Sequence, residues 1–122
     1  MNKRILAVDD SPSVRKLVEF SLKAKGYLVS TAENGQEALE MLQQVKFDGI
    51  ILDINMPRMD GFEFLRMVRG DGRLAAIPVL MLTTEGQDGD KVKAMNLGAT
   101  AYLVKPFRPT EILVALETML SA

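Results

Sequence analysis

The order of apolar segments along the chain is the feature that most constrains its fold. Short apolar runs of strand length alternate with segments in which apolar residues recur every three or four positions, the spacing of an amphipathic helix. The predicted strands are Arg4–Val8, Tyr27–Thr31, Gly49–Asp53, Val79–Thr83 and Ala101–Lys105. This alternation predicts an α/β fold, in which a doubly wound parallel sheet with right-handed crossovers carries helices on both faces.

Residues that favour helix ends stand between these strands. Three predicted helix starts carry capping residues: Ser11 followed by Pro12, Asn34 with Glu37, and Asp60 with Glu63. Glycines that favour helix stops are Gly26, Gly70 and Gly98. Local sequence and the overall alternation therefore predict the same strand–helix units.

Length and composition narrow the possible functions. The chain has 122 residues, which suits one domain over residues 1–122. A net charge of −1 gives no reason to expect nucleic-acid binding, and no apolar run approaches the roughly 18 residues of a membrane span. Cysteine and histidine are both absent, which excludes disulfides, thiolate or imidazole metal sites and a phosphohistidine on this chain. We expect a cytoplasmic protein that does not insert into membranes.

Polar residues fall at the carboxyl ends of four predicted strands. They are Asp9 and Asp10 after the first strand, Asp53 at the third, Thr83 at the fourth and Lys105 at the fifth. In a parallel sheet these ends share one edge, the edge at which open α/β folds bind ligands. Residues far apart in the sequence are therefore expected to meet in one cleft.

The residue types in that cleft favour phosphoryl chemistry with a bound cation. Three carboxylates repel one another unless a cation neutralises them, and oxygen ligands select a hard ion, here Mg²⁺. Three Asp (−3), Lys105 (+1) and Mg²⁺ (+2) sum to zero charge. Asp53 would be the nucleophile that forms an acyl phosphate, with a hydrogen bond from the Thr83 hydroxyl.

Taken singly, each of these residues has an ordinary explanation. Adjacent acids after a strand are commonly capping or solvated residues, and a lone Asp is commonly a turn residue. A Thr is an ordinary strand residue, and a Lys before a proline is more often solvated than catalytic. Their joint placement at four strand ends, in compatible chemistry, favours a functional site.

At these residues the chain resembles the receiver domains of two-component response regulators, particularly the stand-alone chemotaxis-type (CheY-like) members. The resemblance covers essentially the whole chain. The matching segments are Ile5–Asp10, Asp53–Gly61, Leu82-Thr83 and Lys105–Phe107. The resemblance implies a flavodoxin-like (βα)5 sheet in the order 2-1-3-4-5, and a cis bond between Lys105 and Pro106.

The resemblance also implies a role for each site residue. By role these are the phosphoacceptor Asp53; the Mg²⁺ ligands Asp9, Asp10, Asp53 and the backbone carbonyl of Asn55; the phosphoryl-contacting Thr83 and Lys105; the switch pair Thr83 and Tyr102; and the lifetime-tuning Asn55 and Glu85. The last pair matches the fast-decaying chemotaxis type, so a short-lived phosphorylated state is expected.

Partners follow from the same resemblance. A sensor histidine kinase or a histidine phosphotransfer protein would supply the phosphoryl group. A downstream protein would bind the face of the fourth helix, fifth strand and fifth helix, which repacks when the Thr83 hydroxyl moves and the Tyr102 ring turns inward. The protein would not be an enzyme, apart from self-catalysed phosphoryl transfer to Asp53 and its autodephosphorylation.

Two positions depart from the family pattern. Thr84 stands where the family usually has Ala or Gly, and Lys91 stands where an apolar docking residue is expected in the chemotaxis motor binder. The sequence therefore leaves open a role in chemotaxis, a role in another relay, and a receiver excised from a longer regulator.

Two other classes of protein share parts of this pattern. A haloacid-dehalogenase-type Mg²⁺ phosphatase also uses a nucleophilic Asp, a Thr, a Lys and acidic ligands, but its nucleophile follows the first strand in an Asp-x-Asp arrangement. A flavodoxin-like electron carrier would need a phosphate-cradling loop, which is absent here, and aromatic residues are sparse at 6%. The phosphatase is the main alternative to a receiver.

Overall fold

The computed structural model describes residues 2–56, 59–84 and 88–121, in which strands and helices alternate strictly. The elements are β1 (Arg4–Val8), α1 (Pro12–Lys23), β2 (Leu28–Ala32), α2 (Gly35–Gln44), β3 (Gly49–Asp53), α3 (Gly61–Gly70), β4 (Val79–Thr84), α4 (Asp88–Asn96), β5 (Ala101–Lys105) and α5 (Pro109–Ser121). All strand pairs are parallel, in the order β2-β1-β3-β4-β5. The predicted fold class and strand order are confirmed.

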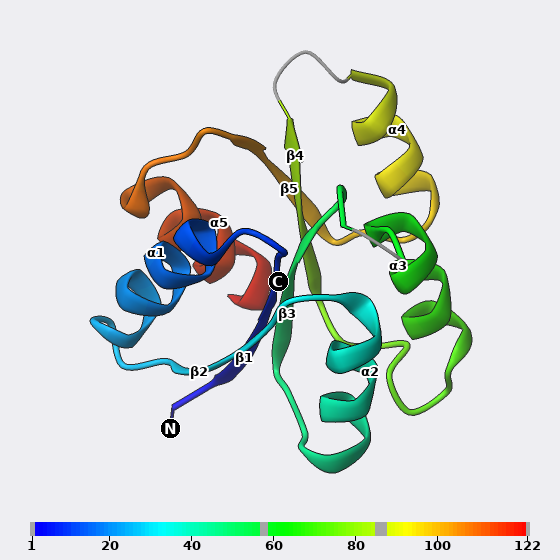
Figure 1. Ribbon diagram of the computed structural model, residues 1–122, viewed down its shortest axis with the longest axis horizontal. Helices are drawn as coiled ribbons and strands as arrows, with labels where there is room; N and C mark the ends of the chain where they lie inside the picture. Colours follow the sequence, from blue (N-terminus) through cyan, green and yellow to red (C-terminus); the bar gives the residue numbers. More distant parts are fainter. Residues whose placement is uncertain (1, 57–58, 85–87, 122) are drawn as a thin grey trace.

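Two layers of helices cover the sheet. Figure 1 shows α1 and α5 on one side and α2, α3 and α4 on the other. Successive strand residues point to opposite faces, so each strand contributes to both cores. In β1, for example, Ile5 and Ala7 belong to the core under α1 and α5, whereas Leu6 and Val8 belong to the core under α2 and α3. This burial on both faces explains why the strands read as nearly continuous apolar runs.

The predicted strand boundaries need small corrections. β2 runs one residue later than predicted, because pairing with β1 begins with Leu28 opposite Arg4. Tyr27 instead donates its backbone N–H to the Leu22 carbonyl at the end of the first helix, at 3.2 Å. β4 is one residue longer than predicted and ends at Thr84, which is paired with Lys105.

Side-chain caps start three helices as predicted. The acceptors are Ser11 Oγ for the Val14 N–H at 3.3 Å, Asn34 Oδ1 for the Glu37 N–H at 2.8 Å, and Asp60 Oδ1 for the Glu63 N–H at 2.9 Å. Each satisfies a backbone donor that the helix itself leaves unpaired. Gly26 and Gly98 adopt the positive φ angles of 92° and 101° that favour glycine after a helix.

Helix α4 contacts the rest of the molecule through one buried alanine and two lysines that lie over aromatic rings. Ala94 is the buried side chain along residues 89–96. Lys91 Nζ lies 4.5 Å from the centre of the Tyr102 ring, and Lys93 Nζ lies 4.4 Å from the centre of the Phe62 ring. Each such contact contributes about 0.5–1 kcal/mol near the surface. The helix therefore lies on the molecule with little apolar packing of its own.

One arginine side chain links the segment before β4 to the turn after α4. Arg69, near the end of α3, donates from Nε to the Gly98 carbonyl at 2.8 Å and from Nη1 to the Ile77 carbonyl at 2.8 Å. Through these hydrogen bonds the guanidinium connects the turn after α4 to the segment before β4. Its partial burial lowers the pKa of Arg69.

None of the helices in the described ranges combines the length and the apolar character that a membrane crossing requires.

A glycine allows α3 to begin directly against the end of β3. The Gly61 N–H donates to the Ile54 carbonyl at 2.8 Å. A Cβ on Gly61 would lie 2.5 Å from the Asp53 carbonyl oxygen and 2.7 Å from Ile54 Cα, both of them backbone atoms. The close approach fixes the position of the chain immediately after Asp53.

We expect Gly61→Ala to lower the free energy of unfolding by about 1–3 kcal/mol, because the added methyl group forces the β3–α3 connection apart. Urea unfolding monitored by circular dichroism measures the change. Gly70→Ala is the matched control within the same helix, since a Cβ there meets nothing within 4 Å. That control should be neutral or slightly stabilising; equal destabilisation by both substitutions would contradict the packing argument.

Candidate functional site

The carboxyl edge of the sheet gathers acidic side chains from two strands. Asp9 and Asp10 follow β1, and Asp53 ends β3, the strand beside it. One carboxylate oxygen from each of the three residues lies within 4.8 Å of the others. Asp9 is 2% exposed and Asp53 is 3% exposed, whereas Asp10 is open to solvent. The predicted meeting of these three residues is confirmed.

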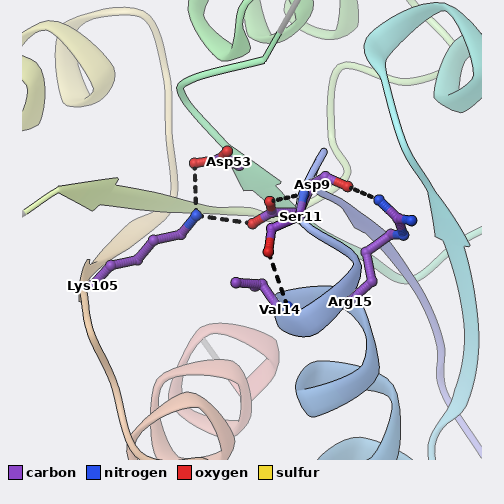
Figure 2. A network of polar contacts seen from close by, with 6 residues as sticks. All are labelled: Asp9, Ser11, Val14, Arg15, Asp53 and Lys105. Carbon is purple, nitrogen blue, oxygen red and sulfur yellow. Dashed lines mark hydrogen bonds and ion pairs between the residues drawn. The ribbon is translucent and has the colours of Figure 1, made fainter.

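Lys105 bridges the two buried carboxylates. Its Nζ donates to Asp9 Oδ2 at 3.0 Å and to Asp53 Oδ1 at 3.1 Å, as Figure 2 shows. The partners lie 96 and 52 positions away in the sequence. Buried carboxylates are tolerated when a cation and hydrogen bonds satisfy them. The ammonium group therefore offsets part of the repulsion in the acidic cluster.

The alternation of strand side chains explains why these three groups meet. Ile51 and Leu103 pack in the core under α1 and α5, and two residues further along each strand come Asp53 and Lys105. The same period of two places Asp9 after Ala7 on that face of the sheet. All three side chains thus lie on the α1–α5 side of the carboxyl edge.

Electrostatics at the site still leave an excess of negative charge. Burial raises the pKa of Asp53, and the negative charge of Asp9 raises it further. The charge and hydrogen bond of Lys105 and a backbone hydrogen bond from Asn55 act in the opposite direction, and the resulting pKa is about 6. Burial alone would lower the pKa of Lys105, but its hydrogen bonds and charge interactions with Asp9 and Asp53 outweigh burial and raise it. Lys105 therefore stays protonated at neutral pH.

Hydrogen bonds to both the main chain and the side chain of Asp9 hold it in the turn from β1 into α1. Its backbone N–H donates to the Ala32 carbonyl at 3.1 Å, and its Oδ1 accepts the Ser11 N–H at 2.9 Å. Its carbonyl oxygen accepts a hydrogen bond from Arg15 Nη1 at 2.6 Å. Sequence reasoning did not single out Arg15. The available signal was a basic residue at the start of a helix, where the helix dipole disfavours positive charge.

The predicted switch residues lie on the other face of the sheet. Tyr102 packs against the core under α2 and α3. Thr83 is 2% exposed and follows Met81 of that core at a spacing of two. The register places Thr83 one residue beyond Leu82, the partner of Asp53 on the neighbouring strand. Thr83 is thus next to the acidic cluster without being part of it, and Tyr102, the partner of Met81, lies further from the carboxyl edge.

The structure describes some of the remaining predicted positions but not all of them. Asn55 is exposed, and its backbone is hydrogen-bonded to Asp53. The bond between Lys105 and Pro106 is cis, as predicted. Glu85 lies outside the described residues, and the side chain of Thr84 is not described either.

The donor set fits a hard divalent cation. Carboxylate oxygens, without sulfur or imidazole, are the ligands that Mg²⁺ prefers, and the cluster already converges within coordination range. Asp53 and Asp9 supply buried oxygens, while the exposed Asp10 leaves the position open to water, which Mg²⁺ usually retains in part. Burial and the negative charge of Asp9 raise the pKa of Asp53, and a bound cation would offset that negative charge.

The fold and this cluster define a class of signalling domain, and the family comparison identifies it. The model of the response regulator receiver domain matches residues 5–117. The chain therefore belongs to the receiver domains of two-component systems, which are signalling proteins rather than classical enzymes. The resemblance read from the sequence is confirmed, and the phosphatase alternative is left without support.

Solved structures agree with this assignment. The chain is 45% identical to the chemotaxis response regulator CheY4 of Vibrio cholerae, with a TM-score of 0.93 over 98% of this chain and 99% of that one. It is 27% identical to the receiver domain of the sensor histidine kinase PA1611 from Pseudomonas aeruginosa, with a TM-score of 0.90 and full coverage of both chains. That structure has a magnesium ion coordinated in its active-site cleft.

Curated relatives are longer than this chain. It is 40% identical, over 98% of its length, to the alkaline phosphatase synthesis transcriptional regulatory protein PhoP of Bacillus subtilis, and covers 49% of that protein. It is 41% identical, over 96% of its length, to the DNA-binding regulator RpaA of Synechocystis, and covers 48% of it. The chain thus spans about half the length of these relatives.

We expect metal-free Asp53→Asn to be more stable than the parent at pH 7, by up to about 3 kcal/mol, and to have a higher Tm. The reason is that folding buries the Asp53 carboxylate beside Asp9 and raises its pKa from 3.8 to about 6. The folded protein then binds this proton more tightly than the unfolded chain. The destabilisation is therefore fully present above pH 6, shrinks as the pH falls, and vanishes below about pH 4, where both states are protonated.

Thermal unfolding in EDTA between pH 4 and pH 7.5 measures this difference. Glu40→Gln, which removes an exposed carboxylate on α2, is the matched control and should change the Tm little. A parent–variant difference for Asp53→Asn that is flat across this range, or of opposite sign at pH 7, would contradict the proposed electrostatics.

Proposed function

We propose that this receiver domain, extending over residues 1–122, is switched by a phosphoryl group carried on Asp53. A sensor histidine kinase or a histidine phosphotransfer protein supplies that group. The observation that carries the proposal is the position of Lys105 Nζ, between the buried carboxylates of Asp9 and Asp53 at 3.0 and 3.1 Å. An ammonium in that place neutralises charge on a phosphoryl group attached to Asp53.

The transfer is a displacement at phosphorus. An Asp53 carboxylate oxygen forms the new O–P bond while the bond from phosphorus to the donor's histidine nitrogen breaks, and the electron pair of that bond stays with the nitrogen. Asp53 attacks as the carboxylate, the form that predominates above its pKa of about 6. Lys105 stabilises the negative charge that develops on the transferring oxygens, and it keeps its proton during the transfer. Hydrolysis by water later restores the carboxylate.

A bound Mg²⁺ fits this scheme. Asp9, Asp10, Asp53 and the backbone carbonyl of Asn55 would hold it, and when bound it supplies positive charge that neutralises the acidic cluster and the incoming phosphoryl oxygens. The magnesium ion in the cleft of the PA1611 receiver domain supports this assignment. This chain's own contribution is the placement of three carboxylates within 4.8 Å of one another.

Phosphorylation then acts on the opposite face of the sheet. Thr83 contacts the phosphoryl group through its hydroxyl, and Tyr102 follows by moving inward. The response changes the surface of α4, β5 and α5, where a downstream protein binds. Exposed apolar side chains on these elements support the proposal; they are Val92, Met95, Val104 and Val114.

The partners follow from the same surface and from the chain's relatives. The similarity to CheY4 supports a role in chemotaxis, and the similarity to PhoP and RpaA supports the receiver part of a longer regulator. In both roles we propose that this domain acts in the cytoplasm by contacting protein rather than nucleic acid, which accords with a net charge of −1. Its own chemistry is limited to acquiring and losing the phosphoryl group.

Incubation with radiolabelled acetyl phosphate and Mg²⁺ tests the phosphoacceptor. The parent should take up at most one phosphoryl group per chain, and the label should be stable to acid and labile to base, as an acyl phosphate is. Asp53→Asn should take up none, because an amide is not a nucleophile here, whereas Glu40→Gln should label like the parent. Equal labelling of Asp53→Asn and the parent, or steady release of phosphate without a labelled chain, would refute the proposal.

The lifetime of the phosphorylated state is a separate prediction. Asn55 and Glu85, the residues two positions after Asp53 and Thr83, match the fast-decaying chemotaxis type, so phospho-Asp53 should decay within seconds to minutes in Mg²⁺ buffer. Loss of label after removal of the phosphodonor measures the rate, with EDTA as the control that slows it. Persistence for many hours in Mg²⁺ would be inconsistent with this role for the two side chains.

A further inference from the structure

Arg15 lies beside the acidic cluster and has no part in the phosphoryl chemistry above. Its Nη1 donates to the Asp9 carbonyl oxygen at 2.6 Å, from a position on the first turn of α1 (Figure 2). Among the described ion pairs, those of the cluster are made by Lys105. The guanidinium therefore contacts the main chain of Asp9, and both carboxylate oxygens of Asp9 keep other partners.

The carbonyl that Arg15 holds belongs to the peptide that joins Asp9 to Asp10. Because a peptide unit is planar, fixing its oxygen also fixes the plane from which the Asp10 Cα departs. Asp9 and Asp10 each contribute a carboxylate oxygen to the cluster that converges within 4.8 Å. One hydrogen bond to this peptide thus constrains both side chains.

Two main-chain hydrogen bonds add to this constraint on the Asp9–Asp10 peptide. The Arg15 backbone N–H donates to the Ser11 carbonyl at 3.0 Å, so the base of its side chain is fixed to the turn. Ser11 in turn donates its own N–H to Asp9 Oδ1 at 2.9 Å. The turn is closed through the main chain and through the guanidinium, which leaves the Asp9–Asp10 peptide little freedom to rotate.

We propose that Arg15 is a positioning residue, which acts through the Asp9 carbonyl to hold Asp9 and Asp10 in the arrangement that binds a divalent cation. This inference rests on the proposed function, since it assigns Arg15 to the Mg²⁺ site of that proposal. Residues that orient metal ligands from outside the coordination sphere typically change metal affinity 10–100-fold when removed.

Electrostatics alone predicts the opposite sign, which makes the proposal testable. A guanidinium repels a divalent cation, so removing its charge should tighten Mg²⁺ binding if Arg15 acted only as a charge. If Arg15 acts by positioning, its removal should weaken binding. The direction of the change in Kd therefore separates the two roles.

The experiment is a calorimetric titration of the whole chain with MgCl₂ at about 0.15 M salt, without a phosphodonor. Arg15→Ala should raise the Kd for Mg²⁺ about 10–100-fold. Arg15→Lys, which keeps a donor and the charge, should recover part of the affinity. Lys16→Ala is the matched control, since it removes a charge from the exposed neighbour on α1, and should leave Kd within about twofold.

Metal-free thermal unfolding of the same proteins separates positioning from loss of the fold. If Arg15→Ala does not fold, Arg15→Gln replaces it, because this shorter, neutral side chain lacks the Nη1 donor that binds the Asp9 carbonyl and should also weaken binding. A parent that binds no Mg²⁺ overturns the proposed metal site and this inference together. A parent that binds, with Arg15→Ala or Arg15→Gln binding equally or more tightly, overturns the role of Arg15 alone.

Discussion

Mutual repulsion among Asp9, Asp10 and Asp53 is the constraint to which the rest of the site responds. Two of the three carboxylates are buried, where water cannot screen them, and Lys105 is the ammonium that contacts both. One positive charge against three negative ones leaves the site short of cations, and the negative charge of Asp9 adds to burial in raising the pKa of Asp53 to about 6. A site with this excess of negative charge fits a metal ion, and with that ion the proposed phosphoryl group.

The parallel sheet is what makes such a site possible. Lys105 and Asp9 are separated by 96 positions, and only the common direction of the strands brings their ends to one edge. The register matters as much as the topology. A slip of one residue in β3 would turn Asp53 to the α3–α4 side and replace it with an apolar neighbour. The closely packed Gly61 opposes such a slip, because the next helix begins against the Asp53 carbonyl.

Much of this architecture could be predicted from the sequence, for identifiable reasons. Strands buried on both faces read as apolar runs, and capping residues such as Asn34 and Asp60 act within three positions of themselves. The meeting of Asp9, Asp53 and Lys105 followed from topology alone. The start of β2 did not, because pairing with β1 rather than local preference decides where that strand begins. Arg15 was missed because its one signal, a basic residue at the start of a helix, does not indicate which carbonyl the side chain binds.

The contacts that hold α4 in place affect how other proteins can bind the domain. Its two cation–ring contacts together contribute about 1–2 kcal/mol, while Arg69 secures only the turn that follows it. An ammonium can slide across the face of a ring without an abrupt loss of energy, unlike an aliphatic side chain lifted out of a core. With Ala94 as the buried side chain of residues 89–96, the helix has little apolar packing, so shifting it costs less free energy than shifting a helix with a full apolar face. A protein that binds this surface therefore contacts a lightly packed helix that lies on a sheet held between two apolar cores.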